Sequence, residues 1–135
     1  MTSWWVAVAA VSAAGLRIVG DGAPDRIAAP GDPARGRALI AARESANCVL
    51  CHAVPDPAVR FAGNVGPSLA GVGTRLSEAQ LRLRVADNVR VNPATVMPSY
   101  YRIDGMDRVA SNYAGKPVLT AQQVEDVVAW LVTLK

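Results

Sequence analysis

The feature that most constrains this chain is the pentapeptide Cys48-Val49-Leu50-Cys51-His52, because it holds every cysteine and histidine of the sequence. A structural zinc ion needs four nitrogen or sulfur ligands, and these residues supply only three. A redox-active cysteine pair is expected in a βαβ unit, and strand signals are nearly absent here. A disulfide between cysteines so close would close a very small loop and stabilise little. All three uses of the cysteines are therefore disfavoured.

The same pentapeptide has the C-x-x-C-H pattern to which c-type haem is attached. Two thiols on one helical turn can reach the two vinyl groups on one side of a porphyrin and form thioethers. The next residue, His52, is then held at the iron, where its imidazole is the expected proximal ligand. The sequence thus predicts one haem c, attached covalently through Cys48 and Cys51.

A methionine is the expected second axial ligand, because the chain has no second histidine. Met97 lies between Val96 and Pro98 in a proline-stiffened apolar loop, whereas Met106 is surrounded by charged residues. We therefore expect Met97 to be the ligand. Histidine–methionine ligation fills both axial positions and favours electron transfer. The alternative, a haem with an open face that acts as a peroxidase or gas sensor, needs Met97 to be absent or to dissociate.

The N-terminal region is interpreted as an export signal. Residues 4–16 carry no charge, but this run is shorter than the roughly 20 apolar residues of a membrane-spanning helix. Small residues between Gly20 and Ala23 offer a cleavage site, and we expect export to the periplasm. A buried N-terminal helix is the alternative, because no Lys or Arg precedes the run. The expected organisation is a signal peptide (1–23), a proline-containing linker (24–31) and one domain (32–135).

The first predicted helix of the domain begins after Asp32, which is a good N-cap residue, with Pro33 at the first helical position. It is expected to run to Glu44. Gly36 lies in its interior, where glycine costs about 1 kcal/mol relative to alanine. We therefore expect a second helix to cross closely at Gly36.

Two further helices are predicted from capping boxes, Ser77 with Gln80 and Thr120 with Gln123. The last helix has an apolar face with helical spacing, which includes Val124, Val127, Val128 and Leu131. An all-α, loop-rich domain is the result. A domain with few large side chains has marginal stability by itself. We therefore expect a bound group to fill its centre.

The loop from Gly66 to Gly71 follows the attachment site and is expected to cover the proximal side of the haem. A backbone carbonyl there can accept a hydrogen bond from the free ring nitrogen of His52. Arg75 is a candidate partner for a haem propionate. The net charge of +3, from 14 basic and 11 acidic residues, is spread thinly, so nucleic acid is not an expected partner.

Together these residues, from Gly31 to Lys135, resemble class I cytochrome c. The resemblance implies an all-α fold of three main helices and loops around one covalent haem. It also implies that the first and last helices cross. At this crossing Gly36 would give room for the aromatic side chain of Trp130. From the GPxL loop it implies Pro67 as the source of the carbonyl and Leu69 as a further cofactor-binding residue.

The segments VMPSYYR and LTAQQVEDVVAWL narrow the resemblance to the SoxX family, the monohaem subunits of SoxAX cytochromes of sulfur-oxidising bacteria. That resemblance implies iron ligation by His52 and Met97. It also implies a complex with L-cysteine S-thiosulfotransferase activity, which oxidatively joins thiosulfate to a cysteine of a carrier protein. The chain itself keeps no free thiol or second histidine for sulfur chemistry, so the bond-making site is expected on a partner.

The expected partners are a SoxA-like dihaem or monohaem subunit, a small soluble cytochrome c that accepts electrons, and the transient carrier protein. Tyr100 and Tyr101 are candidates for contact with a partner, because aromatic residues are enriched at interfaces, or for packing on the porphyrin. The alternative function is a general periplasmic monohaem electron carrier for a dehydrogenase or an oxidase.

Overall fold

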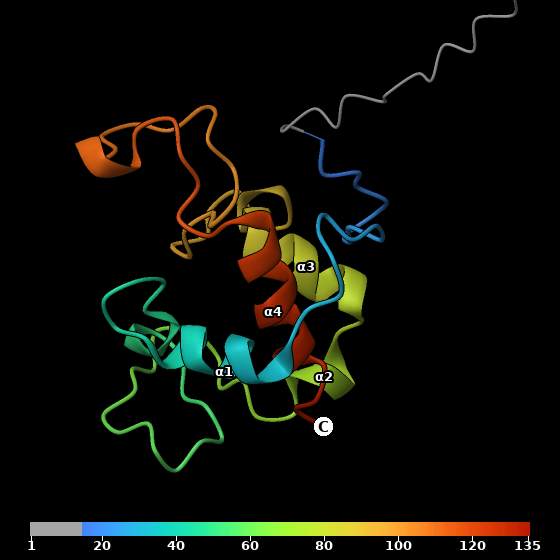
Figure 1. Cartoon of the computed structure of the whole chain (residues 1–135), viewed down its shortest axis with the longest axis vertical. Helices are drawn as coiled ribbons and strands as arrows, with labels where there is room; N and C mark the ends of the chain where they lie inside the picture. The colour runs from blue at the N-terminus through green and yellow to red at the C-terminus, as the bar shows by residue number, and fades with distance from the viewer. Residues whose placement is uncertain (1–14) are drawn as a thin grey trace, which may run out of the picture.

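The computed structural model describes residues 15–135, and its regular elements are helices (Figure 1). Pairing of β type among these residues is limited to an isolated bridge between Val19 and Gly22. The all-α prediction is therefore confirmed. In chain order, with η for a 3-10 helix, the elements are α1 (Pro33–Ala41), η1 (Cys48–Leu50), α2 (Val72–Arg75), α3 (Glu78–Asp87), η2 (Asn88–Arg90), η3 (Ser111–Tyr113) and α4 (Ala121–Leu131).

The helix α1 begins as predicted but ends earlier. The Asp32 side chain accepts a hydrogen bond from the Arg35 amide at 2.9 Å, which caps the helix. The helix stops at Ala41 rather than at Glu44, because Ala42 is extended. The Ala42 carbonyl accepts from the amide of Asn47 at 3.1 Å, and this contact turns the chain toward the attachment segment.

Both predicted capping boxes are present. Ser77 Oγ accepts from the Gln80 amide at 3.2 Å, and Gln80 Oε1 accepts from the Ser77 amide at 2.9 Å. Thr120 and Gln123 make the same reciprocal pair at the start of α4. Each box satisfies amide groups that a helix start otherwise leaves without partners, so local sequence alone fixes where α3 and α4 begin.

The helices α1 and α4 cross in close backbone contact at Gly36. A Cβ atom at this position would clash with the carbonyl oxygen of Asp126, and its next neighbours are the carbonyl carbon of Asp126 and the Cα of Val127. The predicted close crossing is therefore confirmed. The atoms nearest to Gly36 belong to the α4 backbone, however, rather than to the side chain of Trp130.

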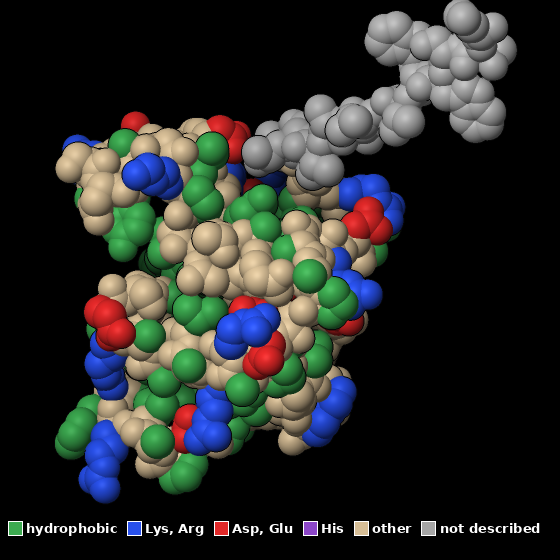
Figure 2. Space-filling view, in the orientation of Figure 1, with side chains coloured by type: hydrophobic (Ala, Val, Ile, Leu, Met, Phe, Trp, Pro, Cys, Tyr) green, Lys and Arg blue, Asp and Glu red, His purple; other side chains and the backbone are tan. Residues whose placement is uncertain are grey.

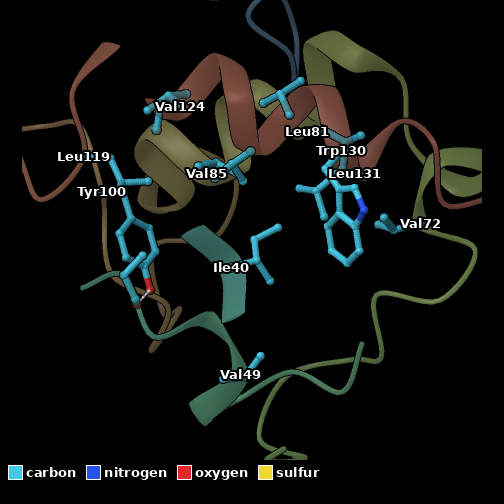
Figure 3. Close-up of a cluster of buried hydrophobic side chains, with 14 residues drawn as sticks. Ile40, Val49, Val72, Leu81, Val85, Tyr100, Leu119, Val124, Trp130 and Leu131 are labelled. Carbon is cyan, nitrogen blue, oxygen red and sulfur yellow. Dashed lines mark hydrogen bonds between the residues drawn. The ribbon is translucent and has the colours of Figure 1, made fainter. Parts of the chain in front are cut away.

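The hydrophobic core lies where α1, α3 and α4 meet (Figure 3). Ile40 comes from α1, Val49 from η1, and Trp130 projects from α4 toward Val72. The helices form a frame that holds the loops. The buried members of the core are Ile40, Ala46, Val49, Val72, Leu81, Val85, Ala86, Tyr100, Leu119, Val124, Val127, Val128, Trp130 and Leu131.

Two loop lobes project from the same side of this frame (Figure 1). One runs from α1 to α2 and contains the attachment pentapeptide, and the other runs from η2 to α4 and contains Met97. The space-filling view shows the surface hollowed between the lobes, with apolar side chains in the hollow (Figure 2).

Between residues 15 and 32 the chain has no helix and packs on the frame. Ala23 is fully buried, and Ile27 packs against the hydrophobic core. Most of the predicted signal peptide, residues 1–14, lies outside the residues that the structure describes. None of the helices within residues 15–135 has the length and apolar character that a membrane span requires.

Candidate functional site

The attachment pentapeptide forms a tight turn. Asn47 adopts the left-handed conformation (φ 49°), and η1 follows it directly. The amides of Cys51 and His52 both donate to the carbonyl oxygen of Cys48, at 3.2 and 3.0 Å. Residues three apart eclipse one another on a 3-10 turn, which places Cys48 and Cys51 on the same side. Two thiols and one imidazole are thus presented by a single short turn.

The two thiols are free and partly buried. Desolvation disfavours the thiolate and raises the pKa of the Cys48 thiol to about 11. The attacking cysteine of a disulfide oxidoreductase instead has a depressed pKa. Across residues 15–135, no three His, Cys, Asp or Glu side chains are grouped so that they could hold a metal ion. The raised pKa of the Cys48 thiol does not favour a redox-active dithiol.

The imidazole of His52 is held by the loop that begins at Gly66. Its Nδ1 lies 2.6 Å from the carbonyl oxygen of Pro67. A carbonyl can only accept, so Nδ1 carries the proton and Nε2 keeps a lone pair available to a metal. Gly66 provides the space, because a Cβ there would clash with the imidazole ring. The structure thus places Pro67 where the expected carbonyl acceptor is needed.

Leu69 and Arg75 both make contacts that fix this loop. Leu69 is partly buried and packs against the hydrophobic core. The exposed Arg75 guanidinium donates to the carbonyl oxygens of Ser68 and Ala70, at 3.0 and 2.7 Å. Arg75 therefore braces the loop backbone, and its contact with a haem propionate stays a prediction.

The two candidate methionines have different surroundings. Met97 is partly buried against the same hydrophobic core that Cys48 contacts. Its amide donates to Thr95 Oγ1 at 3.1 Å, and that hydroxyl also accepts from the Asn88 side chain at 2.8 Å. Met106 is exposed. The fold thus brings Met97, and not Met106, to the core that borders the attachment turn.

Beyond Met97 the chain is bonded back to α3. The hydroxyl of Ser99 donates to Asp87 Oδ1 at 2.7 Å, and both residues are buried. The next two amides donate to carbonyl oxygens of α3 as well, at 3.3 and 3.1 Å. These contacts fix the end of the methionine loop relative to the helical frame.

The two tyrosines after this loop have different environments. Tyr100 is buried, and its hydroxyl donates to the carbonyl oxygen of Ala46 at 2.9 Å. Burial raises the pKa of the Tyr100 phenol above its usual range. Tyr100 is therefore a core residue rather than a candidate partner contact. Tyr101 is partly buried and lines a surface cavity of about 110 Å³.

These observations fit a covalently attached haem. The turn offers two thiols for thioethers, and His52 is oriented with Nε2 free. The lobe that carries this turn and the lobe that carries Met97 flank a hollow with apolar side chains (Figure 2). A porphyrin needs such an apolar setting between two axial donors. Cys48, Cys51, His52 and Met97 are the residues that would hold it.

The family model for cytochrome c matches residues 33–135, so the chain belongs to the cytochrome c family. A cytochrome c domain implies covalently bound haem c and a role in electron transfer. Within this family the chain is SoxX-like. It is similar to a chain in the crystal structure of SoxXA from P. pantotrophus, with 40% sequence identity and a TM-score of 0.82.

The match to SoxXA covers 89% of this chain and 94% of that chain. No curated protein matches this sequence. The expected class I cytochrome c fold and the resemblance to SoxX are thereby confirmed.

The buried aspartates that fix the two lobes were not predicted from the sequence. Asp56 follows His52 by four residues and accepts two hydrogen bonds from Arg37 on α1, at 2.7 and 2.8 Å. Asp87 on α3 accepts from Ser99 in the other lobe. These partners lie 19 and 12 residues apart in sequence, too far for a local motif to reveal them.

Proposed function

We propose that this chain is the haem c electron-transfer subunit of a SoxAX-like complex. The observation that carries the proposal is its 40% identity to a chain of SoxXA across 89% of its length. The complex would reside in the periplasm and couple thiosulfate oxidatively to a cysteine on a carrier protein. The chain would accept electrons from a SoxA-like subunit and pass them to a small soluble cytochrome c.

Within this chain, Cys48 and Cys51 would attach the haem, and His52 and Met97 would bind its iron. The bound haem supplies reversible one-electron transfer. Pro67 holds the His52 ring in one orientation, and the apolar side chains of the hollow would shield a bound haem from water. A rigid, dry setting of this kind reduces reorganisation when charge changes.

The bond-making step would take place on the partner subunit. The chain has two cysteines and one histidine, and all three would be committed to the haem. Joining two sulfur atoms releases two electrons, whereas one haem holds one. The chain would therefore pass the electrons on in two successive steps.

Copurification tests the proposed complex. When the chain is produced with a SoxA-like subunit, we expect a tight complex that elutes as one haem-containing species. A haem-loaded chain that remains a free monomer would instead support the general electron carrier. The same material should show the added mass of one haem on the peptide that contains Cys48 and Cys51.

Substitution of the two methionines tests the axial ligand. Met97→Ala should lower the reduction potential and allow carbon monoxide to bind the reduced protein, because it removes the thioether. Met106→Ala is the matched control, since Met106 is exposed, and it should leave both properties unchanged. Equal effects of the two substitutions would contradict the assignment of Met97.

A further inference from the structure

A well-anchored segment precedes the helical domain: residues 16–31, here called the N-terminal arm. Ala23 is its fixed point, since none of its surface is exposed. Its amide donates to the carbonyl of Ala79 at 2.8 Å, and its carbonyl accepts from Arg82 Nη1 at 2.9 Å. Both backbone groups of Ala23 are therefore bonded to α3.

The arm completes a buried ion pair between α3 and α4. The side chains of Arg82 and Glu125 are 1% and 2% exposed, and two hydrogen bonds of 2.8 and 2.9 Å join them. Ala23 accepts from this arginine, and the Ile27 amide donates to this glutamate at 3.0 Å. Buried charges are tolerated only when their hydrogen bonds are satisfied. The arm is therefore part of the folded domain.

Further contacts extend toward the start of the arm. Asp21 accepts hydrogen bonds from the side chains of Gln80 and Arg84, at distances between 3.0 and 3.2 Å. Leu16 packs against the hydrophobic core and lines the cavity of about 110 Å³ beside Tyr101. Gly15 is different, because it is exposed and a Cβ there would have no neighbour within 4 Å.

The position of a backbone cut decides where a new ammonium group lies. A cut before Ala23 would place that charge on a fully buried residue, and a cut after Ala23 would remove the acceptor of Arg82. The first cut would bury a full positive charge against the Ala79 carbonyl, and the second would leave a buried donor of Arg82 without this acceptor. A cut before Gly15 would place the ammonium group in solvent and leave the contacts of the arm unchanged.

We propose that export processing hydrolyses the Ala14–Gly15 bond, so that the mature protein keeps the whole N-terminal arm. Ser12 and Ala14 give the small residues that a signal-peptide cleavage site needs, after an apolar run of suitable length. Water adds across the amide, leaving a carboxylate on Ala14 and an ammonium group on Gly15. The inference rests on the proposed export and moves the cleavage away from the expected positions between Gly20 and Ala23.

The N-terminus of the mature holoprotein tests this site. The full chain is produced in a bacterium that matures c-type cytochromes, and the haem-loaded protein is isolated from the periplasm. Intact mass and the N-terminal peptide should identify Gly15 as the first residue. A first residue at Asp21 or later would overturn the inference and leave export intact. An uncleaved chain outside the periplasm would overturn both.

A pair of substitutions distinguishes cleavage at the Ala14–Gly15 bond from cleavage between Gly20 and Ala23. Ala14→Arg places a large charged residue at the scissile bond and should lower the yield of processed holoprotein at least tenfold. Ala29→Arg is the matched control, because Ala29 is exposed within the arm, and it should be processed as the wild type is. If Ala14→Arg has the wild-type yield and N-terminus, the inference is wrong.

Hydrogen exchange of the processed protein gives an independent readout. The Ala23 amide is buried and bonded to α3, so the peptide that contains it should exchange far more slowly than the peptide that contains Gly105, a solvent-exposed loop residue. Equally fast exchange of the two peptides would show that the arm is not docked and would remove the basis of the inference.

Discussion

At the scale of single residues, two buried aspartates fix the two halves of the candidate haem site. Asp56 bonds the lobe that carries His52 to α1, and Asp87 bonds the lobe that carries Met97 to α3. Each carboxylate therefore ties to a helix the lobe that carries one proposed axial ligand. Removing the donor of a buried carboxylate lowers the free energy of unfolding by more than an ordinary hydrogen bond contributes. Substitutions at these pairs should therefore destabilise the protein.

Ser99→Ala tests the contact with Asp87. The substitution removes the 2.7 Å hydrogen bond to a buried carboxylate and should lower the free energy of unfolding by about 1–3 kcal/mol. Because the methionine loop is then less firmly held, added imidazole should also bind the oxidised haem protein faster. Denaturant unfolding and stopped-flow absorbance measure the two effects.

The control for this substitution is Ser111→Ala, since Ser111 is exposed in η3. It should change the free energy of unfolding by less than about 0.5 kcal/mol. Wild-type stability and wild-type imidazole binding in Ser99→Ala would show that Asp87 does not position the methionine loop.

The pair formed by Asp56 and Arg37 predicts a pH dependence. Hydrogen bonds from the Arg37 guanidinium and then from the Ala58 amide lower the pKa of Asp56 to about 2. This lies below the value of about 3.9 for an unfolded aspartate. The carboxylate therefore stabilises the fold fully above about pH 4, and this contribution is lost as the pH falls toward 2.

Urea unfolding of the wild type and Asp56→Asn between pH 2 and 6 measures this contribution. The asparagine variant should be less stable above pH 4, and the difference should shrink as the pH falls. A difference that stays constant over this range would show that Asp56 titrates in the same way in both states.

At the scale of elements, the crossing of α1 and α4 determines where the lobes emerge. Gly36→Ala should destabilise the protein by about 1–3 kcal/mol, because a Cβ would clash with the carbonyl of Asp126. Helix propensity alone predicts the opposite sign, a gain of about 1 kcal/mol. Ala38→Gly at an exposed position of α1 is the control and should cost about 1 kcal/mol. Chemical denaturation distinguishes these outcomes, and a stabilised Gly36→Ala variant would contradict the close crossing.

The elements show why some features are predictable from sequence and others are not. The capping boxes of α3 and α4 involve residues three apart, so the sequence contains all the partners. Gly36 was informative because a glycine within a helix conflicts with local propensity and requires a tertiary reason. The end of α1 was not predicted, because a contact of Ala42 with Asn47 stops the helix where local propensity would continue it.

The candidate site divides in the same way. The attachment turn and the glycine–proline loop are local motifs, and the structure brings His52 and Pro67 together as expected. Pairing of the buried aspartates is non-local. Of the 14 basic residues of the chain, the 13 besides Arg37 are alternatives to it as a partner of Asp56, and nothing in the sequence selects Arg37. Arg75 stays a prediction as a propionate partner, and its bonds to the loop carbonyls of Ser68 and Ala70 could not be foreseen from residue type.

At the scale of the whole molecule, few large side chains fill the core that the structure describes. Among residues 15–135, the large aromatic side chains buried in the core are Tyr100 and Trp130, and Phe61 is 93% exposed. The two lobes flank a hollow whose apolar lining would otherwise contact water (Figure 2). A group that binds the folded state and fills this hollow adds its binding free energy to stability. We therefore expect folding to depend on haem attachment.

Replacing both attachment cysteines tests that dependence. Cys48→Ala/Cys51→Ala prevents formation of the thioethers, and we expect loss of most helical signal in far-UV circular dichroism together with loss of a cooperative thermal transition. Leu50→Ala is the matched control, because Leu50 is 61% exposed in the same turn. It should keep the haem, the spectrum and the transition. A haem-free double variant with native helix content would mean that the core formed by α1, α3 and α4 is sufficient, and that the lobes alone depend on the haem.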